Sequence, residues 1–527
     1  MSTTDDYDSD RKPGESFSTV SLHHGQTLDS DHRARAPPIY ASTSFAFEDA
    51  AHGADVSQRR AVLFLTVSIQ VPVAAQHRSF LCSLLRGCLS WHFFFTFATH
   101  FFFFLPDFFS FPFFYISHTP QLFALRKLGP IYTRIMNPTA HVLEYRIAKL
   151  EGSGCDLDGA HPSALATASG QSAQMMAMMT ICRPGDHIIA ASDLYGGTYS
   201  QFQNMYPNMG IETTMVDGQN LEALKAAFKP NTKAVYYETL GNPSFNIPDF
   251  EAVAAICKEN QVPFVVDNTF GMCGYTCRPI KFGVNVVTSS CTKWIGGHGT
   301  TIGGIIVDGN NFDWSVKMPD GSPKFPNLAA PSPAYHGMNF QEVFGPTGPF
   351  SCNMAFIFHA RVVALRDMGA CPNPFGSFQL LMGLETLPLR CKAHSENANA
   401  IAKWLNEHEL VEWVSHASLE SHPSHARAKK YFRKDTYGAV LTFGPKGGYD
   451  AAVTFINSVK LATHLANVGD AKSLVIHPAS TTHQQLSESE QASAGVKNDM
   501  IRVSIGIEDL RDIIADFEQA LQATTKK

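Results

Sequence analysis

The chain has 527 residues, of which 44% are hydrophobic and 17% are charged, as is ordinary for a globular protein of two or three domains. A formal net charge of −6 gives no electrostatic reason to expect nucleic-acid binding. The 11 cysteines form no paired CxxC sets and the 22 histidines form no chelating set, so neither a metal site nor a disulfide framework is predicted.

The N-terminal segment is polar and rich in Asp and Ser, so residues 1–20 are predicted to be a disordered tail. This segment lacks the cationic start and apolar stretch of a secretory signal. Together with the odd number of cysteines, this predicts a reducing compartment, the cytoplasm. Residues 21–136 are predicted to form an N-terminal arm, which an insert at about 57–120 interrupts.

The insert is dominated by phenylalanine, because 13 of the 22 residues from Phe93 to Phe114 are Phe. Residues 91–116 are long enough for a membrane span, but Pro106, Pro112 and Asp107 disfavour one. We interpret the insert as translated non-coding sequence, since pyrimidine-rich nucleotide sequence encodes runs of Phe. If the insert is genuine protein, it is expected to be an exposed, aggregation-prone loop.

Predicted strands alternate with predicted helices from about Asn137 to Asp308. Alternation of this kind predicts an α/β domain, with a mostly parallel sheet and helices on its faces. The expected strands are 187–191, 211–216, 234–238, 264–267, 284–288 and 302–307, and the expected helices between them include 221–228 and 248–260.

Several polar residues lie where such a sheet places its ligands. Gly170 and Gln171 open a Met-rich, helix-favouring run, where backbone N–H groups can bind a phosphate. Tyr195 lies in a loop after a strand, where its ring can stack on a cofactor. Asp267 ends an apolar strand, and open α/β sheets place ligands at the carboxyl ends of their strands. An ordinary capped helix and a turn-capping Asp are the alternatives for Gly170 and Asp267.

The segment from Ser290 to His298 combines hydroxyls, a lysine and glycines directly after a buried strand. Lysine forms a Schiff base with a carbonyl compound when a sheltered site keeps its amine neutral. Ser290 and Thr292 beside Lys293 suit a phosphate group. A lysine, a phosphate site and a carboxylate partner for a pyridinium nitrogen, here Asp267, are the set that pyridoxal phosphate requires of a protein.

A segment rich in Pro, Gly and Asn, residues 323–349, is predicted to end the large domain of residues 137–349 and to lead into a smaller α+β domain of residues 350–527. Arg502 lies in a predicted strand near the end of that domain, where a free surface charge is unusual. The last helix, 509–523, carries an apolar stripe that predicts packing on the core.

Five ordered motifs together resemble the Cys/Met-metabolism family of pyridoxal-phosphate enzymes. The resemblance runs from about Leu22 to Phe517, apart from the insert. It implies an aspartate-aminotransferase-like fold (fold type I), in which the sheet of the large domain has seven strands. The motifs are Tyr132-Thr133-Arg134-Ile135-Met136-Asn137-Pro138-Thr139, Leu194-Tyr195-Gly196-Gly197-Thr198, Val266-Asp267-Asn268-Thr269-Phe270, Ser290-Cys291-Thr292-Lys293-Trp294-Ile295-Gly296-Gly297-His298 and Arg502-Val503-Ser504-Ile505-Gly506-Ile507-Glu508.

The resemblance also implies roles for individual residues. Lys293 is expected to hold pyridoxal phosphate and to shuttle protons, Asp267 to keep the ring nitrogen protonated, and Tyr195 to stack on the ring and assist proton transfer. Tyr132 and Arg134 are expected to reach the phosphate in the partner subunit, and Tyr132 is also a candidate catalytic residue. The other expected cofactor contacts are Gly170, Gln171, Asn242, Ser290 and Thr292, and the expected substrate contacts are Arg502 and Asn467.

The activity that the resemblance implies is γ-replacement, in which O-acetyl-L-homoserine and sulfide give L-homocysteine and acetate. Asn467-Val468-Gly469 resembles the sulfhydrylases of the family, while cystathionine γ-synthase and γ-lyase are the alternatives, and O-acetylserine is open as a second donor. A non-enzyme, membrane-tethered or misfolded because of the insert, is an alternative of another class. The expected partners are the small-molecule substrates and further copies of the chain, in a tetramer of two dimers with shared active sites, without nucleic acid or membrane.

Overall fold

A computed structural model of the chain describes residues 15–26, 36–45, 129–154, 162–242, 244–349, 352–481, 484 and 495–525. The chain divides into two compact units, one of Met1–Phe45 with Pro130–Lys527 and the other of Ala46–Gly129. The insert at 57–120 lies outside the described residues, so its interpretation stays a prediction. In the described part of the chain, no helix is both long and apolar enough to cross a membrane.

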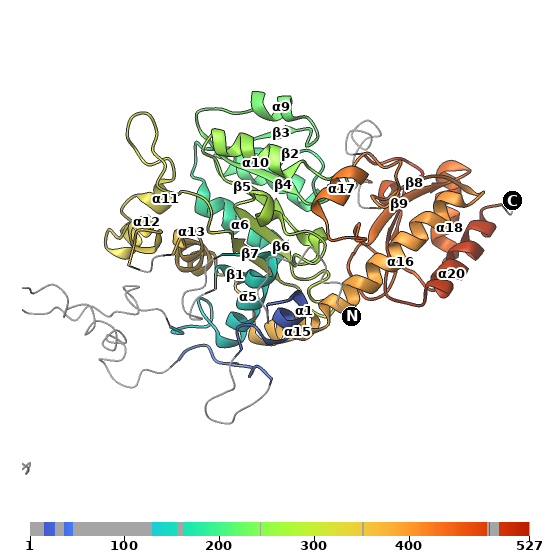
Figure 1. The fold of residues 1–527 in the computed structure, drawn as a ribbon, viewed down its shortest axis with the longest axis horizontal. Coiled ribbons are helices and arrows are strands. Elements are labelled where there is room, and N and C mark those ends of the chain that lie inside the picture. The colour runs from blue at the N-terminus through green and yellow to red at the C-terminus, as the bar shows by residue number, and fades with distance from the viewer. Residues whose placement is uncertain are drawn as a thin grey trace, which may run out of the picture. The chain divides into compact units, whose positions relative to one another are not determined.

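A seven-stranded sheet forms the centre of the first half of the described fold (Figure 1). Its strands lie in the order β1-β7-β6-β5-β4-β2-β3, and only β7 runs antiparallel to its neighbours, so the predicted mostly parallel seven-stranded sheet is confirmed. The first strand was not predicted, because two of its four residues are alanines with little strand preference. The strands are β1 (Ala164–Thr167), β2 (His187–Ala191), β3 (Glu212–Val216), β4 (Thr232–Glu238), β5 (Phe264–Asp267), β6 (Val286–Ser290) and β7 (Gly304–Asp308).

Helices pack on this sheet, with α5 and α6 against its β1–β7–β6 side and α10 against β5. Helix α10 begins at Phe250 and not at Pro248 as predicted, because the Asp249 side chain accepts from the N–H of Ala252 (3.3 Å) and so forms the cap. The helices up to β7 are α5 (Pro138–Glu151), α6 (Gly170–Ile181), α7 (Gly196–Ser200), the π-helix η2 (Gln201–Met205), α8 (Tyr206–Asn208), α9 (Leu221–Ala226), α10 (Phe250–Glu259), and the 3-10 helices η3 (Thr269–Gly271) and η4 (Pro279–Phe282).

A second, five-stranded sheet follows in the order β10-β11-β12-β9-β8. Helix α20 buries the predicted apolar stripe through Ile513, Phe517 and Leu521. The strands are β8 (Val411–Ser415), β9 (Val440–Pro445), β10 (Thr463–His464), β11 (Leu474–Ile476) and β12 (Ile501–Ser504). The helices after β7 are α11 (Pro326–Ala329), η5 (Pro333–Tyr335), α12 (Phe340–Phe344), α13 (Ala355–His359), η6 (Ala360–Leu365), α14 (Arg366–Met368), α15 (Pro374–Glu385), α16 (Leu387–Glu407), α17 (His425–Tyr431), α18 (Gly448–Ser458), η7 (Pro478–Ser480) and α20 (Leu510–Ala523).

The prediction of a disordered tail is wrong for its last residues. Phe17–His23 form helix α1, in which Phe17 and Val20 are buried. The Phe17 ring packs edge-on against Tyr275, with 5.4 Å between the ring centroids. Apolar packing of this kind offsets the entropy cost of ordering the segment. The prediction missed it because it rested on the polar composition of the whole tail.

A buried ion pair joins α5 to η6. The Arg361 guanidinium donates to Oε2 of Glu144 (2.8 Å) and to the carbonyl oxygen of Ala164 on β1 (2.9 Å). The two charged side chains are only 5% and 2% exposed. Since removal of one partner leaves the other charge buried and unpaired, this pair is expected to be costly to break.

Replacement Arg361→Met is therefore expected to lower the free energy of unfolding by about 3–5 kcal/mol, measured by denaturant titration at fixed protein concentration. The matched control is Lys225→Met, which breaks the exposed pair with Glu222 and should leave the free energy of unfolding nearly unchanged. Equal effects of the two substitutions would contradict the importance assigned to the buried pair.

Candidate functional site

The candidate site lies at the carboxyl ends of the parallel strands, where doubly wound sheets place their ligands. Glu238 ends β4, Asp267 ends β5, and Lys293 follows the end of β6 by three residues. Asp267 is the register partner of both Glu238 and Thr288, so these three side chains lie side by side on one edge of the sheet.

The Lys293 amine forms a hydrogen bond with a residue in the C-terminal half of the chain. Its Nζ donates to Oδ1 of Asn467, 174 residues further on. Burial and then the positive charge of Arg502 lower the pKa of Lys293 to about 8. A lysine in such surroundings holds a neutral, nucleophilic amine at a pH where an exposed lysine is charged.

The backbone of the lysine loop is fixed by Arg390 on α16. This guanidinium is 4% exposed and donates to the carbonyl oxygen of Trp294 (2.7 Å) and to that of Ile295 (3.3 Å). Trp294 in turn packs against Gly469, where a Cβ atom would lie 2.8 Å from the indole. The loop that carries Lys293 is thus anchored to residues of the C-terminal half.

Asp267 suits a cationic ring nitrogen. Its Oδ1 accepts from the N–H (2.8 Å) and the hydroxyl (2.5 Å) of Thr269. Burial raises the pKa of the Asp267 carboxyl, and the two hydrogen bonds from Thr269 oppose that rise. A pyridinium N–H beside the carboxylate would offset the cost of burying its charge, so the residue fits the role expected of it.

The residues expected to bind phosphate include the start of α6, the candidate phosphate cradle. Ser169 and Ser172 form a capping box there, while the N–H groups of Gly170 and Gln171 have no acceptor within the helix. A Cβ atom at Gly170 would lie 2.8 Å from Cβ of Ser290, so only glycine lets the helix start approach that strand. Thr292 exchanges hydrogen bonds with the backbone of Gly303 (3.1 and 3.3 Å). The expected phosphate residues therefore meet at a helix N-terminus.

Tyr195 and Asn242 lie on neighbouring loops at the carboxyl-end edge of the seven-stranded sheet. Tyr195 is 53% exposed, and its N–H donates to Oε1 of Glu238 (2.7 Å). The N–H of Asn242 donates to the carbonyl oxygen of Asp193 (3.2 Å), two residues before Tyr195. The Tyr195 ring is thus free to contact a ligand while its backbone is fixed.

Arg502 lies on β12 between β9 and β11, partly buried. Its charge lowers the pKa of Lys293, and burial lowers the pKa of Arg502 itself to about 10 with Tyr195 opposing the shift. Within the described ranges we find no hydrogen bond or ion pair for this guanidinium. A partly buried guanidinium close to Lys293 is suited to binding a substrate carboxylate.

The structure does not bring Tyr132 and Arg134 to the other candidates within one chain. The Arg134 guanidinium lies 5.4 Å from the centroid of the Tyr132 ring and donates to the carbonyl oxygen of Arg366. Tyr132 is 40% exposed.

Sequence reasoning missed Glu238, Asp193 and Thr269. Glu238 ends its strand just as Asp267 does, so the rule that selected Asp267 could have found it. Thr269 donates locally to Asp267 and also makes a contact distant in sequence, because its hydroxyl accepts the N–H of Ser290 (2.8 Å).

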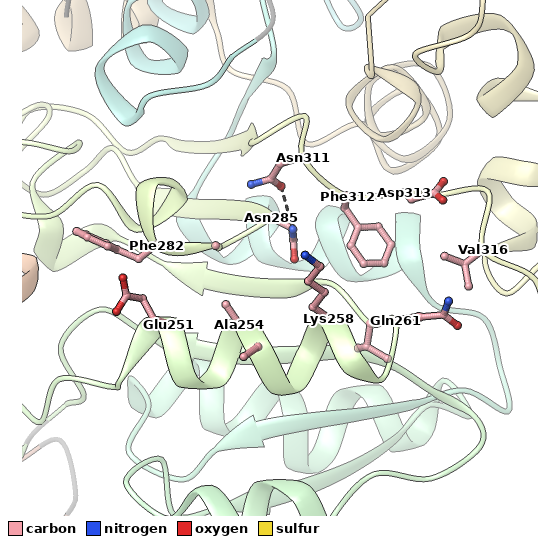
Figure 2. Close-up of a pocket in the computed structure, with 13 residues that line it drawn as sticks. Glu251, Ala254, Lys258, Gln261, Phe282, Asn285, Asn311, Phe312, Asp313 and Val316 are labelled. Carbon is pink, nitrogen blue, oxygen red and sulfur yellow. Dashed lines mark hydrogen bonds between the residues drawn. The ribbon is translucent and has the colours of Figure 1, made fainter. Parts of the chain in front are cut away.

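A pocket of about 550 Å³ lies elsewhere (Figure 2). It is lined by α10 and by residues that precede β5 and β6, such as Val262 and Asn285, which places it at the amino ends of the parallel strands. The pocket is therefore at the edge of the sheet opposite Asp267 and Lys293, and it is not part of the candidate site.

Comparison with known proteins agrees with this geometry. A model of the family described as Cys/Met metabolism PLP-dependent enzyme matches residues 110–522. The chain is 46% identical over 508 residues to homocysteine synthase of Schizosaccharomyces pombe, covering 96% of this chain and 98% of that protein. It is 48% identical over 406 residues to O-acetyl-L-homoserine sulfhydrylase 1 of Thermus thermophilus, covering 77% of this chain and 91% of that protein.

The fold is also similar to a crystal structure of a Campylobacter jejuni protein assigned as an O-acetylhomoserine (thiol)-lyase, with a TM-score of 0.76 and 30% identity over 96% of this chain and 99% of that one. That crystal structure contains N'-pyridoxyl-lysine-5'-monophosphate. The predicted fold class, fold type I, is confirmed, as is pyridoxal phosphate as the cofactor. The chain belongs to the Cys/Met metabolism family of pyridoxal-phosphate-dependent enzymes.

Proposed function

We propose that this protein catalyses γ-replacement, converting O-acetyl-L-homoserine and sulfide into L-homocysteine and acetate. The observation that carries the proposal is the Lys293 amine, which lies close to the Arg502 guanidinium and at the same edge of the seven-stranded sheet as the Asp267 carboxyl. The names of the S. pombe and T. thermophilus relatives supply the substrate class. The reaction exchanges one C–O bond at the γ-carbon for a C–S bond, with acetate as the leaving group.

Bound pyridoxal phosphate supplies an electron-withdrawing ring that stabilises negative charge on the substrate carbons. The neutral amine of Lys293 would bind the cofactor aldehyde and then carry protons to and from the α- and β-carbons. Asp267 would keep a proton on the ring nitrogen. Tyr195 would cover the ring and assist proton transfer through its phenol.

The remaining residues would bind and orient. Arg502 would hold the substrate carboxylate through paired N–H groups, and Asn467, which accepts from Nζ of Lys293, would be the second substrate contact. The phosphate would lie on the start of α6 and against the end of β6. The residues proposed for phosphate or ring contact there are Gly170, Gln171, Ser290, Thr292 and Asn242.

The active site is proposed to be completed by a second copy of the chain, with Tyr132 and Arg134 of the partner subunit reaching the phosphate. An open cavity of about 420 Å³, bordered by Gln171 and Gly197, lies next to the phosphate cradle and offers room for such a segment.

Exposed apolar residues on α15 and α16 support assembly into a tetramer of two dimers, because an oligomer would cover them. Phe375 and Met382 are 60% and 58% exposed and lie seven residues apart on α15, and Leu389 on α16 is 74% exposed. The cytoplasm is the compartment that we propose for the enzyme.

The pH dependence of cofactor loading tests Lys293. The apoprotein should combine with added pyridoxal phosphate faster as the pH rises through about 8, because only the neutral amine attacks the aldehyde. Replacement Arg502→Gln removes a neighbouring positive charge and should move this midpoint to higher pH, measured by cofactor absorbance. Arg511→Gln, at an exposed arginine, should not move it. An unchanged midpoint in Arg502→Gln would contradict the coupling.

The reaction itself is tested by homocysteine formation from O-acetyl-L-homoserine and sulfide. The full-length chain is expected to form homocysteine, and Lys293→Ala should lower kcat by at least about 10²–10⁴-fold. A variant lacking residues 57–120 should retain the activity if the insert is dispensable. O-acetylserine, and cysteine in place of sulfide, are the competing substrates to compare.

A preference for cysteine as acceptor would favour cystathionine γ-synthase, and release of a keto acid without an acceptor would favour a γ-lyase. A chain that stays dispersed only in detergent and binds no cofactor would favour the non-enzyme.

Shared active sites are tested by complementation. Lys293→Ala and Arg134→Ala should each be impaired, but in a mixed dimer one site has both native residues. Co-expression of the two variants should therefore restore about a quarter of the native activity, whereas mixing the separately purified proteins without subunit exchange should not. Failure of the co-expressed dimer to recover would contradict the shared site.

A further inference from the structure

Two carboxyl groups, of which Glu238 is buried and Asp267 half-buried, lie next to each other under the proposed cofactor site. Glu238 on β4 and Asp267 on β5 are register partners in parallel strands, so their side chains lie on the same face of the sheet. Two adjacent carboxyls in a dry environment do not both ionise, because like charges repel and each pays for its own burial. One member of the pair therefore carries a proton at neutral pH.

The hydrogen bonds identify which member is the anion. Asp267 accepts two, both from Thr269, and it keeps some exposure toward the site. Glu238 is only 5% exposed and accepts one, from the Tyr195 N–H, while its Oε2 is buried without a partner in the described part of the chain. Since donors favour the charged form and burial disfavours it, Asp267 is the better anion.

The other titratable groups around Glu238 act in the same direction. Burial and then the charge of Asp267 hold the pKa of the Glu238 carboxyl well above its usual range, and Asp193 raises it further. Asp193 itself has a pKa of about 6, so it is mostly negative at neutral pH. Tyr236, two residues earlier on β4, is neutral because burial raises its pKa.

We propose that Glu238 is a protonated positioning residue, whose neutral carboxylic acid fixes the backbone of Tyr195 and leaves Asp267 as the anion of the pair. The inference rests on the proposed function in its assignment of Asp267 and Tyr195 to the cofactor. An ionised Glu238 would bind the Tyr195 N–H at least as well, but its charge would favour the protonated form of Asp267, so that Asp267 would no longer be the anion facing a protonated ring nitrogen. A protonated Glu238 binds the Tyr195 N–H and still leaves Asp267 as the anion of the pair.

Two substitutions separate charge from hydrogen bonding. Glu238→Gln keeps the shape and the acceptor oxygen of the neutral acid, and Glu238→Ala removes both. In the holoenzyme, Glu238→Ala should lower kcat/KM by about 10-fold or more, the size of effect expected for loss of one buried hydrogen bond, and Glu238→Gln should regain most of it. If Glu238→Gln is impaired as strongly as Glu238→Ala, the charge is needed and the proposal is wrong.

Infrared spectroscopy of the holoenzyme, with ¹³C-labelled glutamate, reads the proton directly. The native protein should show a protonated-carboxyl band at neutral pH that Glu238→Gln removes. In Asp267→Asn, where the neighbouring charge is gone, the band should titrate away at lower pH than in the native protein. Absence of the band from the native protein at neutral pH, or its persistence in Glu238→Gln, would overturn the proposal. If the native protein binds pyridoxal phosphate but forms no homocysteine, the proposed function fails while this band still decides the state of Glu238.

Discussion

The register of three parallel strands is the constraint on which the candidate site depends. Because β4, β5 and β6 pair without a shift near their carboxyl ends, Glu238, Asp267 and Thr288 share one line across the sheet. Backbone hydrogen bonds fix this alignment. A slip of one residue in β5 would turn the Asp267 side chain to the opposite face, away from the lysine loop.

The candidate site contains two basic side chains, Lys293 and Arg502, and two acidic ones, Glu238 and Asp267. The Arg502 guanidinium is near enough to the Lys293 amine to lower the pKa of that amine, while burial and the charge of Asp267 raise the pKa of the Glu238 carboxyl. Groups that would carry like charges are kept together in places of limited water access, which favours the neutral form of one member of each pair. Such an arrangement is unfavourable for the protein alone, and a ligand with an anionic and a cationic end relieves it.

Much of the fold and of the candidate site could be predicted from the sequence, and there are physical reasons why the remaining contacts could not. Lys293 and Asp267 were found because a polar residue at the end of an apolar strand is a local signal. The partner of Lys293 is Asn467, and the contact that places it joins segments far apart in the chain, which no periodicity reveals. Tyr132 and Arg134 were assigned only through resemblance. Their role depends on a second copy of the chain, so one chain leaves it a prediction. The domain limits at 349/350 are likewise a prediction.

The anchoring of the lysine loop by Arg390 has a consequence for how this protein can be divided or recombined. The loop that carries Lys293 precedes residue 350, yet its carbonyl groups and its amine are held by Arg390 and Asn467, which follow it. A chimaera that takes its C-terminal half from a distant relative would import both of these contacts together with the Arg502 strand. Exchange of the half after residue 350 would thus alter the contacts that hold the Lys293 loop, so neither half can be replaced without effect on the other.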